Sequence, residues 1–109
     1  MKLFAVTGKP VWHSLSPQLH NAGFNSLGIR ARYFRLAASS ARQALLISRQ
    51  LGLSGLNVTA PFKQDMADLM DALDKTARET GVVNTVVFEG KRTVGYNTDP
   101  YGVVAAVKS

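Results

Sequence analysis

Lys63 lies where a side chain of this sequence could bind a small ligand or move a proton. It follows the apolar stretch 53–58, which reads as a buried strand, and the turn that contains Pro61. Proline has no amide hydrogen to extend a sheet ladder, so Lys63 is expected just after the strand, near the start of the next helix. Ligands of open α/β sheets bind at the C-terminal ends of strands. Lys63 is therefore a candidate site residue, although the usual role of a lysine is a solvated surface charge.

Four other positions offer hydroxyl or amide groups that could act with Lys63. Ser14 and Ser16 put two hydroxyls beside a predicted helix N-terminus, which suits a carboxylate ligand, although Ser16 alone could be a helix cap. Thr59 could shape a turn or contact a ligand. Asn84, where a strand is predicted to begin, could close a turn or donate to a ligand hydroxyl.

Asp99 is the candidate partner of Lys63 in proton transfer. It precedes Pro100, a pair typical of a helix start, but its carboxylate could also accept a proton from a substrate alcohol. A carboxylate beside a lysine holds the proton on the ammonium, so Lys63 and Asp99 are expected to act as one coupled catalytic dyad. His13 and His20 are expected to be structural. With two histidines and no cysteine, the sequence predicts no metal site and no disulfide.

The elements that must position these residues alternate along the chain. Such alternation implies a mostly parallel sheet covered on both faces, to which a hairpin adds one antiparallel strand. Strands are predicted at 2–6, 31–36, 53–58, 82–89 and 92–96, and helices at 17–27, 64–73 and 101–107. Two more helices are predicted: one is capped by Ser39 or Ser40 and ends at Gly52, and the other is capped by Asp74 and ends at Gly81. Apolar helix faces are formed by Leu19, Ala22, Gly23 and Leu27, by Ala44, Leu45, Ile47 and Leu51, and by the core residues Met66 and Met70.

The charge of the chain favours a small anionic ligand. The 109 residues suffice for one domain, and their net charge is +6. Residues 1–63 hold eight Lys or Arg and no Asp or Glu. Such a basic half could contact nucleic acid, but the arginines are spread out and no aromatic-rich RNA-binding signature follows, so a small anion is favoured. No stretch is long and apolar enough for a membrane helix, which makes a cytoplasmic location the default.

Four stretches, taken in their order and spacing, resemble the N-terminal substrate-binding domain of the shikimate dehydrogenase family. This resemblance implies an open three-layer α/β/α sandwich, with a mostly parallel sheet of about six strands and one antiparallel strand. It also implies an enzyme that reduces 3-dehydroshikimate to shikimate with NADPH, in aromatic amino-acid biosynthesis. The matching stretches are 8–17 with His20-Asn21, 55–63, 83–85 and 95–99.

Carried onto this sequence, the resemblance implies a role for each candidate residue. Ser14 and Ser16 would hold the substrate carboxylate. The ring hydroxyls would be bound by Thr59, Lys63, Asn84 and Asp99, and the proton would be handled by Lys63 and Asp99.

The sequence departs from the family in two ways. Pro100 stands where the family usually has glycine. Residues 1–109 read as one substrate-binding domain with no G-x-G-x-x-G fingerprint, so the NADP-binding Rossmann domain is absent from this stretch. NADP is therefore expected for the full-length enzyme and no cofactor for this domain alone, which should bind shikimate or 3-dehydroshikimate without turnover.

The alternatives are a stand-alone shikimate- or quinate-binding module and a quinate dehydrogenase fragment. Apolar surface left uncovered makes self-association plausible.

Overall fold

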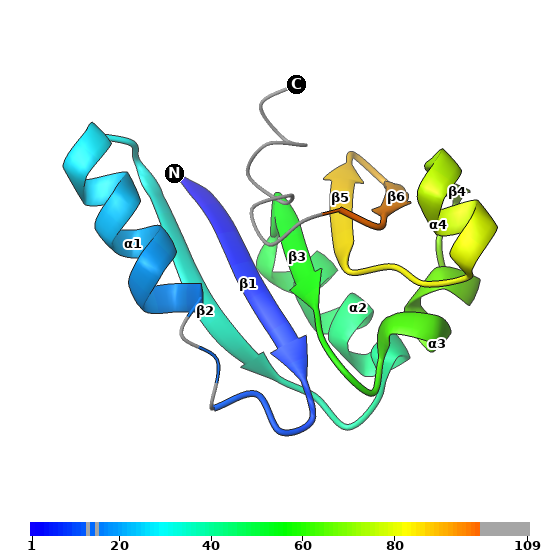
Figure 1. Ribbon diagram of the computed structural model, residues 1–109. Helices are drawn as coiled ribbons and strands as arrows, with labels where there is room; N and C mark the ends of the chain where they lie inside the picture. The colour runs from blue at the N-terminus through cyan, green and yellow to red at the C-terminus, as the bar shows by residue number, and fades with distance from the viewer. Residues whose placement is uncertain (13, 15, 99–109) are drawn as a thin grey trace.

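The computed structural model describes residues 1–12, 14 and 16–98, in which six strands form one sheet (Figure 1). β1 is parallel to β2 and β3, β4 is parallel to β6, and β5 is antiparallel to both of its neighbours. One strand thus runs against the rest, which confirms the predicted mostly parallel sheet with one antiparallel strand. The strands are β1 (Lys2–Gly8), β2 (Ala31–Ala37), β3 (Gly55–Val58), β4 (Ala72–Leu73), β5 (Thr85–Glu89) and β6 (Arg92–Tyr96), in the order β2-β1-β3-β5-β6-β4.

Helices pack on both faces of this sheet. Phe4 and Val6 of β1 pack with Phe24 of α1 (Ser16–Leu27). Ala5, between them, belongs to a larger cluster with α2 (Ala41–Leu51) and α3 (Lys63–Asp68). Because successive strand side chains point to opposite faces, the two clusters lie on opposite sides of the sheet. The predicted three-layer α/β/α architecture is therefore confirmed.

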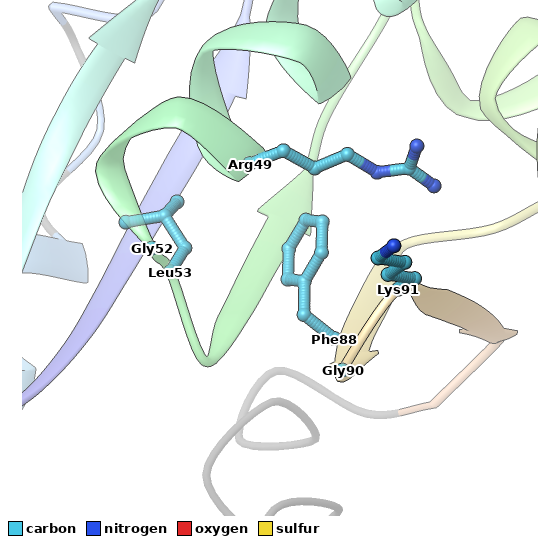
Figure 2. Close-up of a pocket in the computed structure, with 6 residues that line it drawn as sticks. All are labelled: Arg49, Gly52, Leu53, Phe88, Gly90 and Lys91. Atoms are coloured by element: carbon cyan, nitrogen blue, oxygen red, sulfur yellow. The ribbon is translucent and has the colours of Figure 1, made fainter.

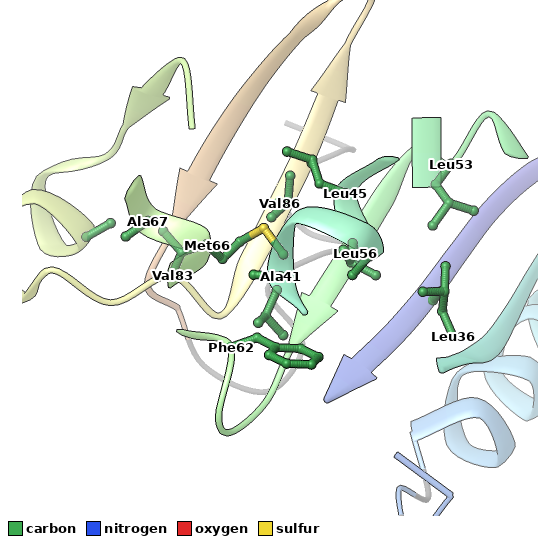
Figure 3. Close-up of a cluster of buried hydrophobic side chains, with 14 residues drawn as sticks. Leu36, Ala41, Leu45, Leu53, Leu56, Phe62, Met66, Ala67, Val83 and Val86 are labelled. Carbon is green, nitrogen blue, oxygen red and sulfur yellow. The ribbon is translucent and has the colours of Figure 1, made fainter. Parts of the chain in front are cut away.

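The larger cluster joins the middle of the sheet to α2 and α3. Leu56 of β3, Met66 of α3 and Val86 of β5 are fully buried in it (Figure 3). Met70 is partly buried and packs against the same cluster, so both methionines belong to the core, as predicted. The predicted inward position of Leu51 is wrong, because that side chain is 49% exposed.

The inward face of α1 is not the apolar face seen in the sequence. Leu19 and Leu27 are 65% and 72% exposed, whereas Phe24 is buried. The reason is that two polar residues of α1 face the sheet: His20 stacks on the Tyr33 ring, and Asn21 bonds to the Tyr33 backbone. A polar network has displaced the apolar stripe that helical periodicity would have buried.

The predicted helix 64–73 ends early. α3 stops at Asp68, and Ala72–Leu73 forms the short edge strand β4. Asp71 causes this change, because its N–H donates to the carbonyl of Thr93 while its carboxylate accepts from the Thr93 N–H at 2.7 Å. These bonds attach the segment to β6 as an edge strand.

The predicted helix caps are largely confirmed. The side chain of Ser40 caps α2, and that of Asp74 caps α4 (Lys75–Thr80). Gly52 and Gly81 end these helices in the left-handed region that glycine allows. The predicted helix 101–107 lies outside the described residues. Within the described ranges, no helix combines the length and apolarity that a membrane span requires.

Candidate functional site

Thr59 lies where β3 leaves the sheet, against the C-terminal end of β1. Its N–H and its hydroxyl both donate to the carbonyl of Thr7, over 2.9 and 3.3 Å. A Cβ on Gly8 would lie 2.0 Å from Thr59 Oγ1, so this close approach requires glycine. The N–H of Lys9 donates to the carbonyl of Ala60 at 3.2 Å, which joins the two loops at the sheet edge.

Lys63 begins α3 beside the segment that enters β5. Its carbonyl accepts from the N–H of Val83 at 3.0 Å, and the N–H of Val58 donates to the carbonyl of Asn84 at 2.8 Å. The buried ring of Phe62 anchors this turn in the larger apolar cluster. Lys63 and Asn84, both half-buried, are thus brought together near the end of β3. Asp99 lies outside the described residues, so its pairing with Lys63 stays a prediction.

The guanidinium of Arg35 holds the backbone of Ser14, two residues before Ser16. Its Nε and Nη2 both donate to the carbonyl of Ser14, over 3.0 and 2.5 Å. The N–H of Ser16 donates to Ser14 Oγ at 3.2 Å, so the Ser14 side chain bonds the first amide of α1. Two hydroxyls, a helix N-terminus and an arginine therefore meet at one place. That set of groups is suited to a carboxylate.

Tyr33 of β2 connects the serines to β3. Its ring is buried, and its hydroxyl donates to Asn57 Oδ1 at 2.5 Å. Burial raises the pKa of Tyr33 well above its ordinary value, and a side-chain hydrogen bond with Ser16 opposes that rise. The Ser16 side chain thus interacts with Tyr33, whose hydroxyl donates to Asn57.

Asn57 continues this path into β5. Its Nδ2 lies 3.4 Å from Thr85 Oγ1 and 3.5 Å from the carbonyl of Asn84. Thr85 Oγ1 donates to Asn84 Oδ1 at 2.9 Å. The side chain of Asn84 then pairs with the backbone of Thr98, accepting from its N–H at 3.0 Å and donating to its carbonyl at 2.5 Å. An unbroken polar path thus runs from Ser16 across the sheet to the residue before Asp99.

His20 and Asn21 fix the position of Tyr33. The imidazole of His20 stacks on the Tyr33 ring with centroids 4.3 Å apart, and its Nδ1 lies 2.9 Å from the carbonyl of Ser16. The amide of Asn21 accepts from the Tyr33 N–H at 2.8 Å and donates to the Tyr33 carbonyl at 2.7 Å. These contacts give His20 the structural role that was predicted for it. His13 lies outside the described residues.

The sequence did not single out Tyr33 or Arg35 as site residues. The available signal was the alternation of β2, which puts positions 33 and 35 on one face of the strand. Within the described part of the chain, no three His, Cys, Asp or Glu side chains gather to hold a metal ion. The described part of the site therefore consists of hydroxyls, amides, one lysine and one arginine.

Comparisons with known proteins show what this chain is similar to. A family model described as the shikimate dehydrogenase substrate binding domain matches residues 6–86. The shikimate dehydrogenase (NADP(+)) of Haloarcula marismortui is 46% identical over 109 residues, a match that covers 98% of this chain and 41% of that protein.

Solved structures give the same result. Shikimate dehydrogenase from Aquifex aeolicus aligns with a TM-score of 0.84 at 39% identity, covering 99% of this chain and 41% of that one. Shikimate 5-dehydrogenase from Listeria monocytogenes, in complex with shikimate and NAD, aligns with a TM-score of 0.84 at 32% identity, covering 99% and 38%. The chain thus spans about two fifths of the length of these relatives.

Proposed function

The chain belongs to the family of shikimate dehydrogenase substrate-binding domains, as its motifs predicted, and from this premise we propose that it binds shikimate and 3-dehydroshikimate. The observation that carries the proposal is the polar path from Ser16 through Tyr33 and Asn57 to Asn84. It links the residues expected to bind the carboxylate with those expected to bind the ring hydroxyls. The proposed activity is that of an NADP-dependent shikimate dehydrogenase.

The carboxylate of the substrate is proposed to bind at Ser14 and Ser16. Ser14 Oγ accepts from the Ser16 N–H, so its own hydroxyl hydrogen can point to a ligand. The Ser16 side chain interacts with Tyr33, and its hydroxyl would turn toward the carboxylate of the substrate. The guanidinium of Arg35 supplies positive charge beside both serines.

The ring hydroxyls are proposed to bind at Thr59, Lys63, Asn84 and Asp99. The Nδ2 group of Asn84 carries two hydrogens, and one of them is used on the Thr98 carbonyl. The second is available for a substrate hydroxyl. The Lys63 ammonium offers three donors, none of which bonds to a described residue.

Lys63 and Asp99 are the proposed catalytic residues. NADPH supplies a hydride to the carbonyl carbon of the substrate when it is bound. The carbonyl oxygen then needs a proton, which the Lys63 ammonium is proposed to donate, and Asp99 would keep that ammonium charged beforehand.

With no dinucleotide fingerprint in residues 1–109, we propose that NADP is held by a further domain of the enzyme and that these residues alone give no turnover. The proposed location is the cytoplasm.

Calorimetry with shikimate tests the binding proposal. We expect saturable binding of shikimate, at least tenfold weaker binding to Ser14→Ala/Ser16→Ala, and no change for Ser26→Ala, which removes an exposed hydroxyl of α1. Quinate titrated in parallel distinguishes a shikimate site from a quinate site. Absence of shikimate binding to the folded chain would reject the proposal. NADPH oxidation by residues 1–109 alone would reject the requirement for a separate cofactor domain.

A further inference from the structure

A hollow lies at the opposite end of β3 from the candidate site. Its volume is about 490 Å³, and one wall is formed by Arg49, Gly52 and Leu53, at the end of α2 and the entry to β3 (Figure 2). Phe88 and the turn Gly90-Lys91, between β5 and β6, form the other wall. Because β3 starts at this hollow and ends near Thr59, the two places are separated by the length of the strand.

The two walls of the hollow are fixed to each other. The N–H of Phe88 donates to the carbonyl of Ser54 at 3.1 Å, next to the ladder that pairs Gly55 with Val87. Leu53 is buried, and the Phe88 ring packs partly against the larger apolar cluster. The hollow therefore has a stable apolar floor.

Two cationic side chains, Arg49 and Lys91, line the hollow beside this apolar floor. Figure 2 shows the side chains of Arg49 and Lys91 reaching to the same side of the Phe88 ring. Among the residues that the structure describes, neither side chain makes an ion pair or a hydrogen bond. Two cations beside an aromatic ring form an environment for an anion with a flat apolar body.

No carboxylate of a described residue forms an ion pair with Arg49 or Lys91, although Asp71 interacts electrostatically with Arg49. One carboxylate oxygen of Asp71, Oδ2, accepts from both the N–H and the hydroxyl of Thr93. Glu89 follows Phe88 in β5 and so points to the other face of the sheet, where Arg92 is its partner in the strand register. Neither carboxylate lines the hollow.

We propose that this hollow is a second binding site, distinct from the shikimate site, for a small aromatic carboxylate. The ring of the ligand would lie against Phe88 and Leu53, and its carboxylate would bridge Arg49 and Lys91. The volume falls within the range of pockets that hold small molecules. Arginine presents a planar pair of donors that matches a carboxylate, while lysine adds a compact charge. The proposal does not depend on what the first site binds.

Titration with benzoate, followed through the backbone amide NMR signals of the 109-residue chain, tests this proposal. We expect saturable shifts at Gly52, Gly90 and Lys91. Acetate, which lacks the ring, and benzyl alcohol, which lacks the charge, should each bind at least tenfold more weakly.

Variants identify the groups responsible. Arg49→Gln/Lys91→Gln should weaken benzoate binding at least tenfold, and Lys91→Gln alone should weaken it measurably. Lys75→Gln/Arg78→Gln removes the same charge from α4, outside the hollow, and should change nothing. Three results would overturn the proposal: no saturable shift at these amides, acetate binding as well as benzoate, or an unchanged affinity in the Arg49/Lys91 variant. Concentration-dependent shifts at the same amides without benzoate would also reject it, since a second copy would then occupy the hollow.

Discussion

The hydroxyl of Tyr33 donates to Oδ1 of Asn57 over 2.5 Å, and this bond connects the two halves of the candidate site. On one side, the side chain of Ser16 interacts with Tyr33. On the other, the Asn57 amide points its Nδ2 at Thr85 and at the carbonyl of Asn84. Because Tyr33 fixes which end of the Asn57 amide accepts, it determines the direction of the hydrogen bonds beyond it. We infer that Tyr33 positions the substrate-binding groups.

Replacing Tyr33 with phenylalanine removes this bond while keeping the ring. We expect shikimate affinity to fall about tenfold and the free energy of unfolding to fall by about 1–3 kcal/mol, because Asn57 Oδ1 loses its donor. Calorimetry and urea denaturation measure the two effects. The matched control is Tyr96→Phe, which removes a hydroxyl that bonds to no described residue and should leave both quantities unchanged. Equal effects of the two variants would contradict the role given to Tyr33.

The buried phenol also predicts a loss of stability at alkaline pH. Burial raises the pKa of Tyr33 above its ordinary 10.0, so above that pH the unfolded chain releases this proton while the folded chain retains it. The free energy of unfolding should therefore decline above about pH 10, by at most about 1.4 kcal/mol per pH unit from this group. Urea denaturation of the wild type and of Tyr33→Phe between pH 9 and 11 isolates the contribution of Tyr33 to this decline, since the other titrating groups are the same in the two proteins. Parallel pH profiles would disprove it.

Asp71 predicts the opposite dependence in acid. Hydrogen bonds from the N–H and the hydroxyl of Thr93 lower the pKa of Asp71 below its ordinary 3.8, with a smaller contribution from Arg49 and Arg92. The stabilisation is therefore complete above about pH 4 and is lost as the pH falls through the lowered pKa. Asp71→Asn should flatten the decline in stability between pH 4 and 2. Asp68→Asn, which removes an exposed carboxylate of α3, should leave that decline intact.

Gly8 tests the packing between the ends of β1 and β3. A methyl group there would meet Thr59 Oγ1 at 2.0 Å and the carbonyl of Ala60 at 3.1 Å, so Gly8→Ala must displace Thr59. We expect a destabilisation of about 1–3 kcal/mol together with weaker shikimate binding. Gly23→Ala is the matched control, because no atom lies within 4 Å of its added methyl on α1. That change should raise stability by up to about 1 kcal/mol, as measured by thermal unfolding. A neutral Gly8→Ala would show that this loop can shift freely.

Much of the fold was predictable because local signals agreed with the final packing. Ser40 and Asp74 act as side-chain caps, Gly52 and Gly81 end their helices, and the alternation of elements gave the parallel sheet. The motif order also gave the family, which the matches to known proteins confirm.

The errors arose where a distant hydrogen bond outweighed a local preference. Leu19 and Leu27 of α1 looked like a core face, but His20 and Asn21 face the sheet because Tyr33 offers them a ring to stack on and backbone groups to bond. Periodicity contains no information about such partners.

The helix predicted to continue to residue 73 fails for a similar reason. Asp71 bonds to the backbone and hydroxyl of Thr93, 22 positions later, and that long-range pairing replaces helical turns with β4.

In the site, Ser14, Ser16, Thr59, Lys63 and Asn84 could be selected by residue type and position. Tyr33 and Arg35 could not, because they lie in a strand that gave no functional signal.

The bond between Asn21 and the backbone of Tyr33 has a consequence for the behaviour of the protein in concentrated solution. β2 is the outermost strand on its side of the sheet, and exposed strand edges recruit strands from other molecules into aggregates. The amide of Asn21 occupies both the N–H and the carbonyl of Tyr33, in the middle of that strand. The side chain of Asn21 thereby makes the N–H and the carbonyl of Tyr33 unavailable for pairing with a strand of another molecule.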